Sequence, residues 1–169
     1  MMRRGFAWCV GGWLASVQVG YFLLLETHVT AAALVYFLMV GLWLGGAIIG
    51  LSLPRSQEAG WLIAAVGTFY LAAATLRTVP DGWTGYAALA CVVIGGIYSG
   101  QFFVAQRRLF AHNGELFLWE NTGFLVGWVS GIGVWLWAGE QTLLWMPALW
   151  LMGVLAARAA LQLPIRGKG

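Results

Sequence analysis

The most constraining feature of this chain is a series of six long apolar stretches separated by short polar breaks. A helix needs roughly 20 apolar residues to cross a bilayer, and lipid offers no partner to the backbone of a less regular segment. Hydrophobic residues make up 61% of the chain and charged residues only 9%, which is more apolar surface than a small soluble domain can bury. We therefore predict a single all-α membrane domain, with transmembrane helices at about 5–25, 31–53, 60–77, 84–105, 117–138 and 142–163.

The proline positions agree with these breaks. Pro54, Pro80 and Pro164 each follow a predicted span, and Pro147 falls within the first turns of the last one. Proline is tolerated near helix starts and helps to end helices, because its ring removes a backbone N–H donor. The prolines therefore support the predicted boundaries.

The basic residues are distributed unequally between the two sides of the predicted membrane domain. With the N-terminus placed inside, only Arg77 lies on the outer side. The inner side holds Arg3, Arg4, Arg55, Arg107, Arg108, Arg158, Arg166 and Lys168. Because cytoplasmic loops carry an excess of lysine and arginine, we expect an even number of spans, both termini in the cytoplasm, and a location in a bacterial inner membrane.

Glycines recur at intervals of four residues in three of the predicted spans. This interval is about one helical turn, so each series forms a flat stripe where another helix can approach closely. The predicted packing glycines are Gly41, Gly45, Gly46, Gly50, Gly96, Gly100, Gly123, Gly127 and Gly131. The stripes favour either close packing within one chain or docking of another subunit.

A faint internal repeat relates the two halves of the chain. Residues 19–23 (Val-Gly-Tyr-Phe-Leu) end the first predicted span, and residues 99–103 (Ser-Gly-Gln-Phe-Phe) end the fourth. An offset of three spans gives the halves opposite orientations in the membrane, as in the inverted repeats of many transporters. The predicted fold is therefore a 3+3 inverted-repeat bundle of six transmembrane helices.

Several segments together resemble a known family. The apolar run 21–26, which ends in Glu26, and the Gly-x-x-x-Gly segment 41–46 resemble the start of the membrane domain of membrane-bound spermidine synthase-like proteins. Residues 95–109 are similar to that family's glycine-rich span with its basic exit, and residues 120–127 to its acidic residue followed by Gly-x-x-x-Gly. The resemblance implies one half of a major-facilitator-like fold, with three plus three inverted spans.

The chain departs from this family in one respect. The family's aminopropyl-transferring enzyme domain, with its glycine-rich nucleotide loop and acidic motifs, has no counterpart in the sequence. We therefore expect a membrane module that is not an enzyme, and we do not transfer polyamine synthesis to this chain.

Five polar side chains are candidates for a functional site inside the membrane, because ionisable groups in lipid are costly and often functional. Glu120 and Arg158 fall at a similar depth near the inner side, so we expect them to form an ion pair. Gln101 and Asn121 lie near the same level, and Gln18 lies deeper, where an interhelical hydrogen bond is its expected role. The alternative to a structural ion pair is a proton or substrate site on the cytoplasmic side.

Sequence motifs for cofactors or metals are lacking. His28 and His112 fall in breaks on opposite sides, which excludes a haem held by both, and neither histidine has an assigned role. The chain contains no H-E-x-x-H, phosphate-binding loop or dinucleotide-binding motif. We expect no metal, no nucleic acid and no catalytic residue, and the prediction leaves room for a bound lipid or quinone.

Two classes of function remain. The first is a non-catalytic integral membrane subunit that anchors or completes a larger complex, for example one for electron transfer; the short loops, glycine stripes and 11 tryptophans favour it. The second is a small transporter in which two half-facilitator-like modules act as a homodimer; the inverted repeat and Glu120 favour it. The expected partners are membrane lipid and either other subunits or a second copy.

Overall fold

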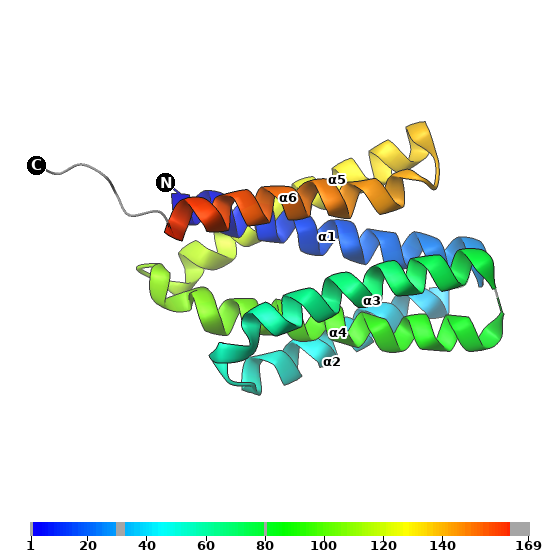
Figure 1. Cartoon of the computed structure of the whole chain (residues 1–169), viewed down its shortest axis with the longest axis horizontal. Coiled ribbons are helices and arrows are strands. Elements are labelled where there is room, and N and C mark those ends of the chain that lie inside the picture. Colours follow the sequence, from blue (N-terminus) through cyan, green and yellow to red (C-terminus); the bar gives the residue numbers. More distant parts are fainter. Residues whose placement is uncertain (1, 30–32, 80, 163–169) are drawn as a thin grey trace, which may run out of the picture.

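The computed structural model describes residues 2–29, 33–79 and 81–162, and this part of the chain is helical without strands. The all-α bundle predicted from the sequence is therefore confirmed (Figure 1). The six long helices are α1 (Met2–His28), α2 (Ala33–Ser52), α3 (Glu58–Thr78), α4 (Gly82–Gln106), α5 (Asn113–Ala138) and α6 (Thr142–Gln162). Two short 3-10 turns, η1 (Arg55–Gln57) and η2 (Arg107–Leu109), precede α3 and follow α4.

The helix boundaries lie close to the predicted ones. Pro54 stands between α2 and η1, as expected of a helix-ending residue, and Pro147 lies inside α6. Pro80 and Pro164 lie outside the described residues. The start of α4 is held by a capping box, in which Asp81 accepts a hydrogen bond from the Thr84 backbone N–H at 2.7 Å, the arrangement that satisfies free N–H groups at a helix start.

Of the helices that the structure describes, five are long and apolar enough to cross a membrane, and α5 is the exception. Its first half carries Glu115, Glu120 and Asn121, which lower its average hydropathy. Large apolar side chains are exposed on the outside of the bundle, among them Phe37 at 69% and Leu136 at 71%, which suits contact with lipid rather than water. The chain is an integral membrane protein, and the crossing by α5 stays a prediction.

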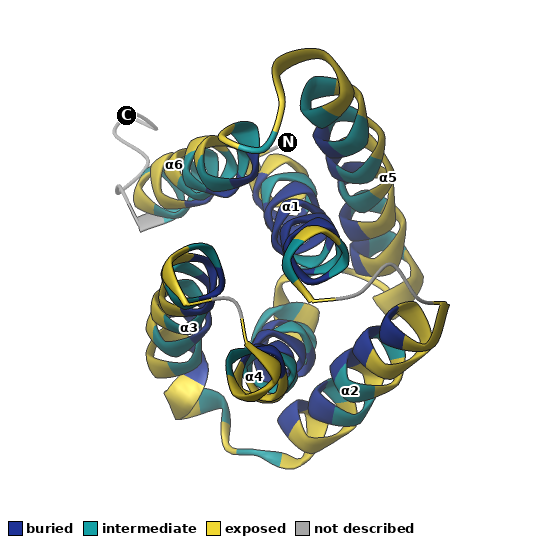
Figure 2. Ribbon diagram, turned by 90° about the vertical axis from the view of Figure 1, so that its right-hand side faces the viewer, coloured by how far each residue is buried: buried dark blue, intermediate teal, exposed yellow. Residues whose placement is uncertain are grey.

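The two halves of the chain exchange partners in the bundle. α1 packs mainly against α5 and α6, whereas α4 packs mainly against α2 and α3. Figure 2 shows α1 and α4 in the middle, with the other four helices around them. Thus the first helix of each half lies against the last two helices of the other half, which is the arrangement expected of a 3+3 repeat.

Glycines permit the two closest helix pairs, α1 with α5 and α2 with α4. On α5, a Cβ atom added to Gly123 would collide with the backbone of Trp8. On α4, a Cβ atom added to Gly96 would collide with the carbonyl group of Trp43. The same close approach occurs at Gly46, Gly50, Gly100 and Gly127, and Gly131 would place its Cβ 3.4 Å from Val19. These seven predicted packing glycines are confirmed.

The prediction is wrong for the remaining two glycines, Gly41 and Gly45, which pack against no other helix in the described part of the chain. A Cβ atom added to either would meet nothing within 4 Å, because both lie on the side of α2 that faces away from α4. Gly46 directly follows Gly45, and Gly46 and Gly50 face α4 instead. One residue turns a helix by about 100°, so the two successive glycine pairs on α2 point in different directions and cannot share one partner.

The predicted register of the internal repeat is also wrong. Gly20 lies against the ring of Phe69 on α3, at 2.8 Å from an added Cβ, whereas Gly100 lies against the backbone of α2. The equivalent glycines are instead Gly11 and Gly96. An added Cβ would strike the carbonyl oxygen of Glu120 at the first and of Trp43 at the second, and each struck residue lies three positions before a glycine that packs back onto the facing helix, Gly123 and Gly46. The two halves therefore pack in a repeated way, but the repeat aligns Gly11 with Gly96 and not Gly20 with Gly100, as the similar sequence segments suggested.

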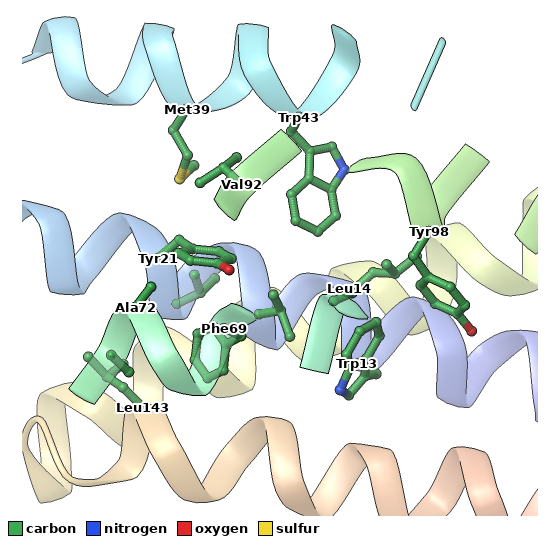
Figure 3. Close-up of a cluster of buried hydrophobic side chains, with 14 of the residues drawn as sticks. Trp13, Leu14, Tyr21, Met39, Trp43, Phe69, Ala72, Val92, Tyr98 and Leu143 are labelled. Carbon is green, nitrogen blue, oxygen red and sulfur yellow. The ribbon is translucent and has the colours of Figure 1, made fainter. Parts of the chain in front are cut away.

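Aromatic side chains fill the centre of the bundle (Figure 3). Trp13 of α1 and Tyr98 of α4 meet edge to face with ring centroids 5.3 Å apart, which joins the two central helices. Tyr21 of α1 meets Phe69 of α3 in the same way at 5.2 Å. Edge-to-face contacts are a favoured geometry for aromatic rings, so these pairs fix how the two halves face each other.

Candidate functional site

One end of the bundle carries an ion cluster around Glu140, which lies just before α6. Arg77, at the end of α3, donates from Nε to Oε1 of Glu140 at 2.7 Å and from Nη2 to its carbonyl oxygen at 2.9 Å. His28, at the end of α1, places Nε2 3.0 Å from the same Oε1. Burial alone would raise the pKa of the Glu140 carboxyl, but the hydrogen bonds from His28 and Arg77 hold that pKa below its usual range.

The other end carries a matching cluster around Glu58, the first residue of α3. Arg158, near the end of α6, donates to Oε2 of Glu58 at 3.4 Å, and Gln106, at the end of α4, donates to Oε1 at 3.4 Å. The predicted ion pair between Glu120 and Arg158 is therefore wrong. Arg158 belongs to α6 and Glu120 to α5, and these two helices pack on different sides of α1 (Figure 2).

Two of the other three polar candidates, Gln101 and Asn121, donate hydrogen bonds to backbone carbonyl oxygens. Gln101 is fully buried and donates from Nε2 to the carbonyl oxygens of Gly50 at 2.7 Å and Leu53 at 3.0 Å, so it ties α4 to the end of α2. Asn121 is exposed and donates to the carbonyl oxygen of Phe117 in its own helix at 2.8 Å. Gln18 is half-buried in α1, and the interhelical hydrogen bond predicted for it is not formed within the described residues.

Glu120 lines a cavity of about 460 Å³ that lies between α2, α4 and α5. Ligand sites for small molecules commonly range from roughly 300 to 1,000 Å³. The polar side chains of its lining are Ser99, Arg107, Asn113, Glu120 and Asn121. Arg107 and Asn113 belong to the η2 turn and the start of α5, so the cavity extends toward the end of the bundle where those segments lie.

The rest of the lining is apolar and rich in aromatic rings. Trp43 of α2, Phe103 of α4, and Phe117 and Phe124 of α5 contribute to it. The rings of Phe103 and Phe117 are stacked, with centroids 4.7 Å apart and planes 26° from parallel. The three phenylalanines were not predicted from the sequence, although Phe117, Glu120 and Phe124 recur at helical spacing and so share one face of α5.

Glu120 is the one buried acid of the described residues that lines this cavity, at 6% exposure. Its carboxylate makes no ion pair and no hydrogen bond within the described part of the chain. Arg107 lines the same cavity but is exposed, and the two form no salt bridge. A buried carboxylate loses its hydration at considerable cost unless a proton or a cation compensates it, so Glu120 marks the cavity as the candidate site.

The histidines do not contribute to this cavity. His28 belongs to the Glu140 cluster, and His112 precedes α5 at the opposite end of the bundle, as predicted. Within the described residues, no three His, Cys, Asp or Glu side chains come together as a metal site would require.

The site therefore consists of one buried carboxylate, unpaired among the described residues, in a cavity whose walls are mostly apolar and aromatic. A comparison with known proteins finds no match among family models, curated proteins or solved structures.

Proposed function

We propose that this chain is a small membrane transporter, in which two half-facilitator-like modules act together as a homodimer. The observation that carries the proposal is Glu120, a buried carboxylate without a partner in the described residues, which lines a cavity large enough for a small solute. Ionisable side chains inside membrane bundles commonly mark substrate or ion pathways.

The cavity also has the form expected of half of a transport pathway. Leu44, Leu51 and Phe117 line it and yet remain 57%, 53% and 54% exposed. Because its own walls are half-exposed, this chain does not close the cavity on every side. A second copy could close it, and the exchanged 3+3 packing is the kind of module from which facilitator-like transporters are assembled.

The proposed orientation places both termini in the cytoplasm of a bacterial cell. The basic residues of the η1 and η2 turns, together with Arg3, Arg4 and Arg158, belong to one end of the bundle, and Arg77 belongs to the other (Figure 1). The positive-inside rule then assigns the first end to the cytoplasm. In this orientation the Arg107 end of the cavity is the cytoplasmic end.

The experiment is a flux measurement on purified protein in proteoliposomes, with a panel of small cationic, neutral and anionic solutes. Ser99→Phe fills the cavity, because Ser99 lines it. We expect this variant to lower the flux of the transported solute by about tenfold or more. Ser52→Phe makes the same exchange at an exposed position of α2 outside the cavity lining, and we expect its flux to equal that of the unchanged protein.

Absence of flux for the whole panel, from protein shown to be dimeric, would contradict the proposal. The same holds if Ser99→Phe and Ser52→Phe reduce flux equally, because transport would then not pass through this cavity.

The second candidate is a non-catalytic subunit of a larger membrane complex, and one specific observation favours it. Gly41 and Gly45 lie one turn apart on the outward side of α2 with nothing within 4 Å of an added Cβ. A helix of another protein could approach closely there. Gly41→Leu would then remove partner chains that co-purify in mild detergent, whereas under the transport proposal it leaves flux unchanged.

A further inference from the structure

We propose that the ligand of this cavity is an organic cation with an apolar body, which places its positive charge at Glu120. The inference deepens the proposed function and rests on it, because it names the class of solute that the same cavity would carry. It follows from the charge, the walls and the size of the site.

The charge of the site is set by the carboxylate of Glu120. Glu120 is 6% exposed, and no donor or cation among the described residues compensates its carboxylate. Two basic side chains at this end of the bundle already have acidic partners, since Arg4 binds Glu115 at 2.7 Å and Arg158 binds Glu58. A cationic ligand would therefore supply the missing counter-charge, whereas an anionic ligand would bring a second negative charge close to the carboxylate of Glu120.

Arg107 is the cation that could favour an anionic ligand instead. It lies on the η2 turn, where its side chain is exposed to solvent. Solvent weakens the interaction of an exposed charge far more than that of a buried one. The buried Glu120 therefore outweighs Arg107 in selecting the sign of the ligand's charge.

The walls indicate what kind of cation fits. Trp43, Phe103, Phe117 and Phe124 surround the cavity with aromatic rings. Ring faces attract cations, and quaternary ammonium groups are recognised in this way. A metal ion is disfavoured, because hard cations need about six oxygen ligands and the lining offers a single carboxylate and few other oxygens. Apolar walls and one acid together match an apolar organic cation.

The position of Glu120 in the fold supports the same conclusion. Gly11 meets the carbonyl oxygen of Glu120, and Gly96 meets that of Trp43, so these two residues occupy equivalent positions on α5 and α2. Both line the cavity. The packing of two similar halves thus brings an acid from one half and an aromatic ring from the other to the same cavity.

The test uses two probes of equal size and shape but opposite charge, tetraphenylphosphonium and tetraphenylborate. Each is radiolabelled, and binding is measured to the purified full chain in lipid nanodiscs, with empty nanodiscs as the blank for partition into lipid. We expect saturable binding of the phosphonium and none of the borate. Glu120→Gln should weaken phosphonium binding by about tenfold or more, because it removes a buried countercharge.

Three further variants distinguish charge from folding. Glu115→Gln removes a carboxylate from the same helix outside this cavity, and we expect it to bind like the unchanged protein. Glu120→Asp keeps the charge and should retain phosphonium binding within about threefold, whereas Phe117→Leu removes a ring and should lose about threefold. Size-exclusion chromatography checks that each variant elutes as a single species like the unchanged protein. A variant that does so and still fails to bind has lost the site and not the fold.

The outcomes separate the inference from the proposed function. Preferential binding of tetraphenylborate, equal binding of both ions, or undiminished phosphonium binding by Glu120→Gln would each overturn the inference. If the flux assay at the same time shows transport of a neutral or anionic solute that Ser99→Phe blocks, the proposed function stands without it. If no solute crosses but the phosphonium binds through Glu120, transport is wrong and the cation site remains.

Discussion

The two halves of the molecule share their packing but differ in what they contribute to the cavity. Glycines bring α5 onto α1 in one interface and α2 onto α4 in the other. At equivalent positions of these interfaces stand Glu120 on α5 and Trp43 on α2. The packing is therefore repeated while the chemistry is not, and the proposed cation site lies where the two halves differ.

The ends of the bundle repeat the same relation. At one end Arg77 from α3 and His28 from α1 bind Glu140 before α6; at the other, Arg158 from α6 and Gln106 from α4 bind Glu58 of α3. Each cluster joins the last residues of a helix in one half to the first residues of a helix in the other. The clusters thus fix the exchange of partners, and they differ mainly in burial.

The largest expected effect tests the difference between Trp43 and Glu120. Trp43→Ala should lower the free energy of unfolding by about 4 kcal/mol, because it empties a large buried volume between α2 and α4. Glu120→Gln should raise it by about 1 kcal/mol, because it replaces a buried carboxyl group that has no partner among the described residues by a neutral amide. Reversible unfolding by dodecyl sulfate in mixed micelles measures both. A loss of stability in Glu120→Gln would show that the carboxylate is structural and would remove the contrast.

The glycine interfaces test the similarity of the halves. Gly11→Ala and Gly96→Ala should each cost about 3 kcal/mol, because the added methyl group would meet a carbonyl oxygen of the facing helix. Gly41→Ala, on the open side of α2, serves as the control and should change stability by no more than about 0.5 kcal/mol. The same unfolding assay applies. A loss of stability in Gly96→Ala but not in Gly11→Ala would mean that the two interfaces are not equivalent.

The ion clusters should differ according to the burial of the acid. Arg158→Gln leaves Glu58, whose side chain is 8% exposed, without its cation, and we expect a cost of about 2 kcal/mol. Arg77→Gln leaves Glu140, which is 36% exposed and keeps His28, and the expected cost is about 1 kcal/mol or less. The fraction of each variant that still elutes as a single species after heating ranks the two costs. The reverse ranking would contradict the role given to burial.

The smallest effect is the pH dependence at the Glu140 end. Since the folded-state pKa of Glu140 lies below its usual range, its contribution to stability is fully present above the ordinary carboxyl pKa and is lost as the pH falls through the lowered value. Melting temperatures measured from neutral pH downward should therefore fall in acid, and Glu140→Gln should reduce that fall. An unchanged acid dependence in Glu140→Gln would exclude this carboxylate as the group responsible.

The sequence predicts the central residue of the site but not the residues around it. Glu120 stands out because a carboxylate within an apolar span is costly, but its neighbours in space belong to α1, α2 and α4, far away along the chain. The prediction therefore chose Arg158, which has a similar depth, and missed Glu58. Depth follows from position along a helix, whereas the side of the bundle depends on which helices pack together.

The sequence by itself determined the number and approximate ends of the helices, and the apolar composition that places the chain in a membrane. These properties depend on local runs of residues, because each helix satisfies its own backbone hydrogen bonds in lipid. Only the tertiary structure decided that α1 pairs with α5 and α6, that Gly41 and Gly45 face outward, and that Glu120 shares a cavity with aromatic rings and has no counterion among the described residues. Such contacts depend on the rotation of each helix about its axis and on the choice of partner, and both are settled by close packing between distant segments.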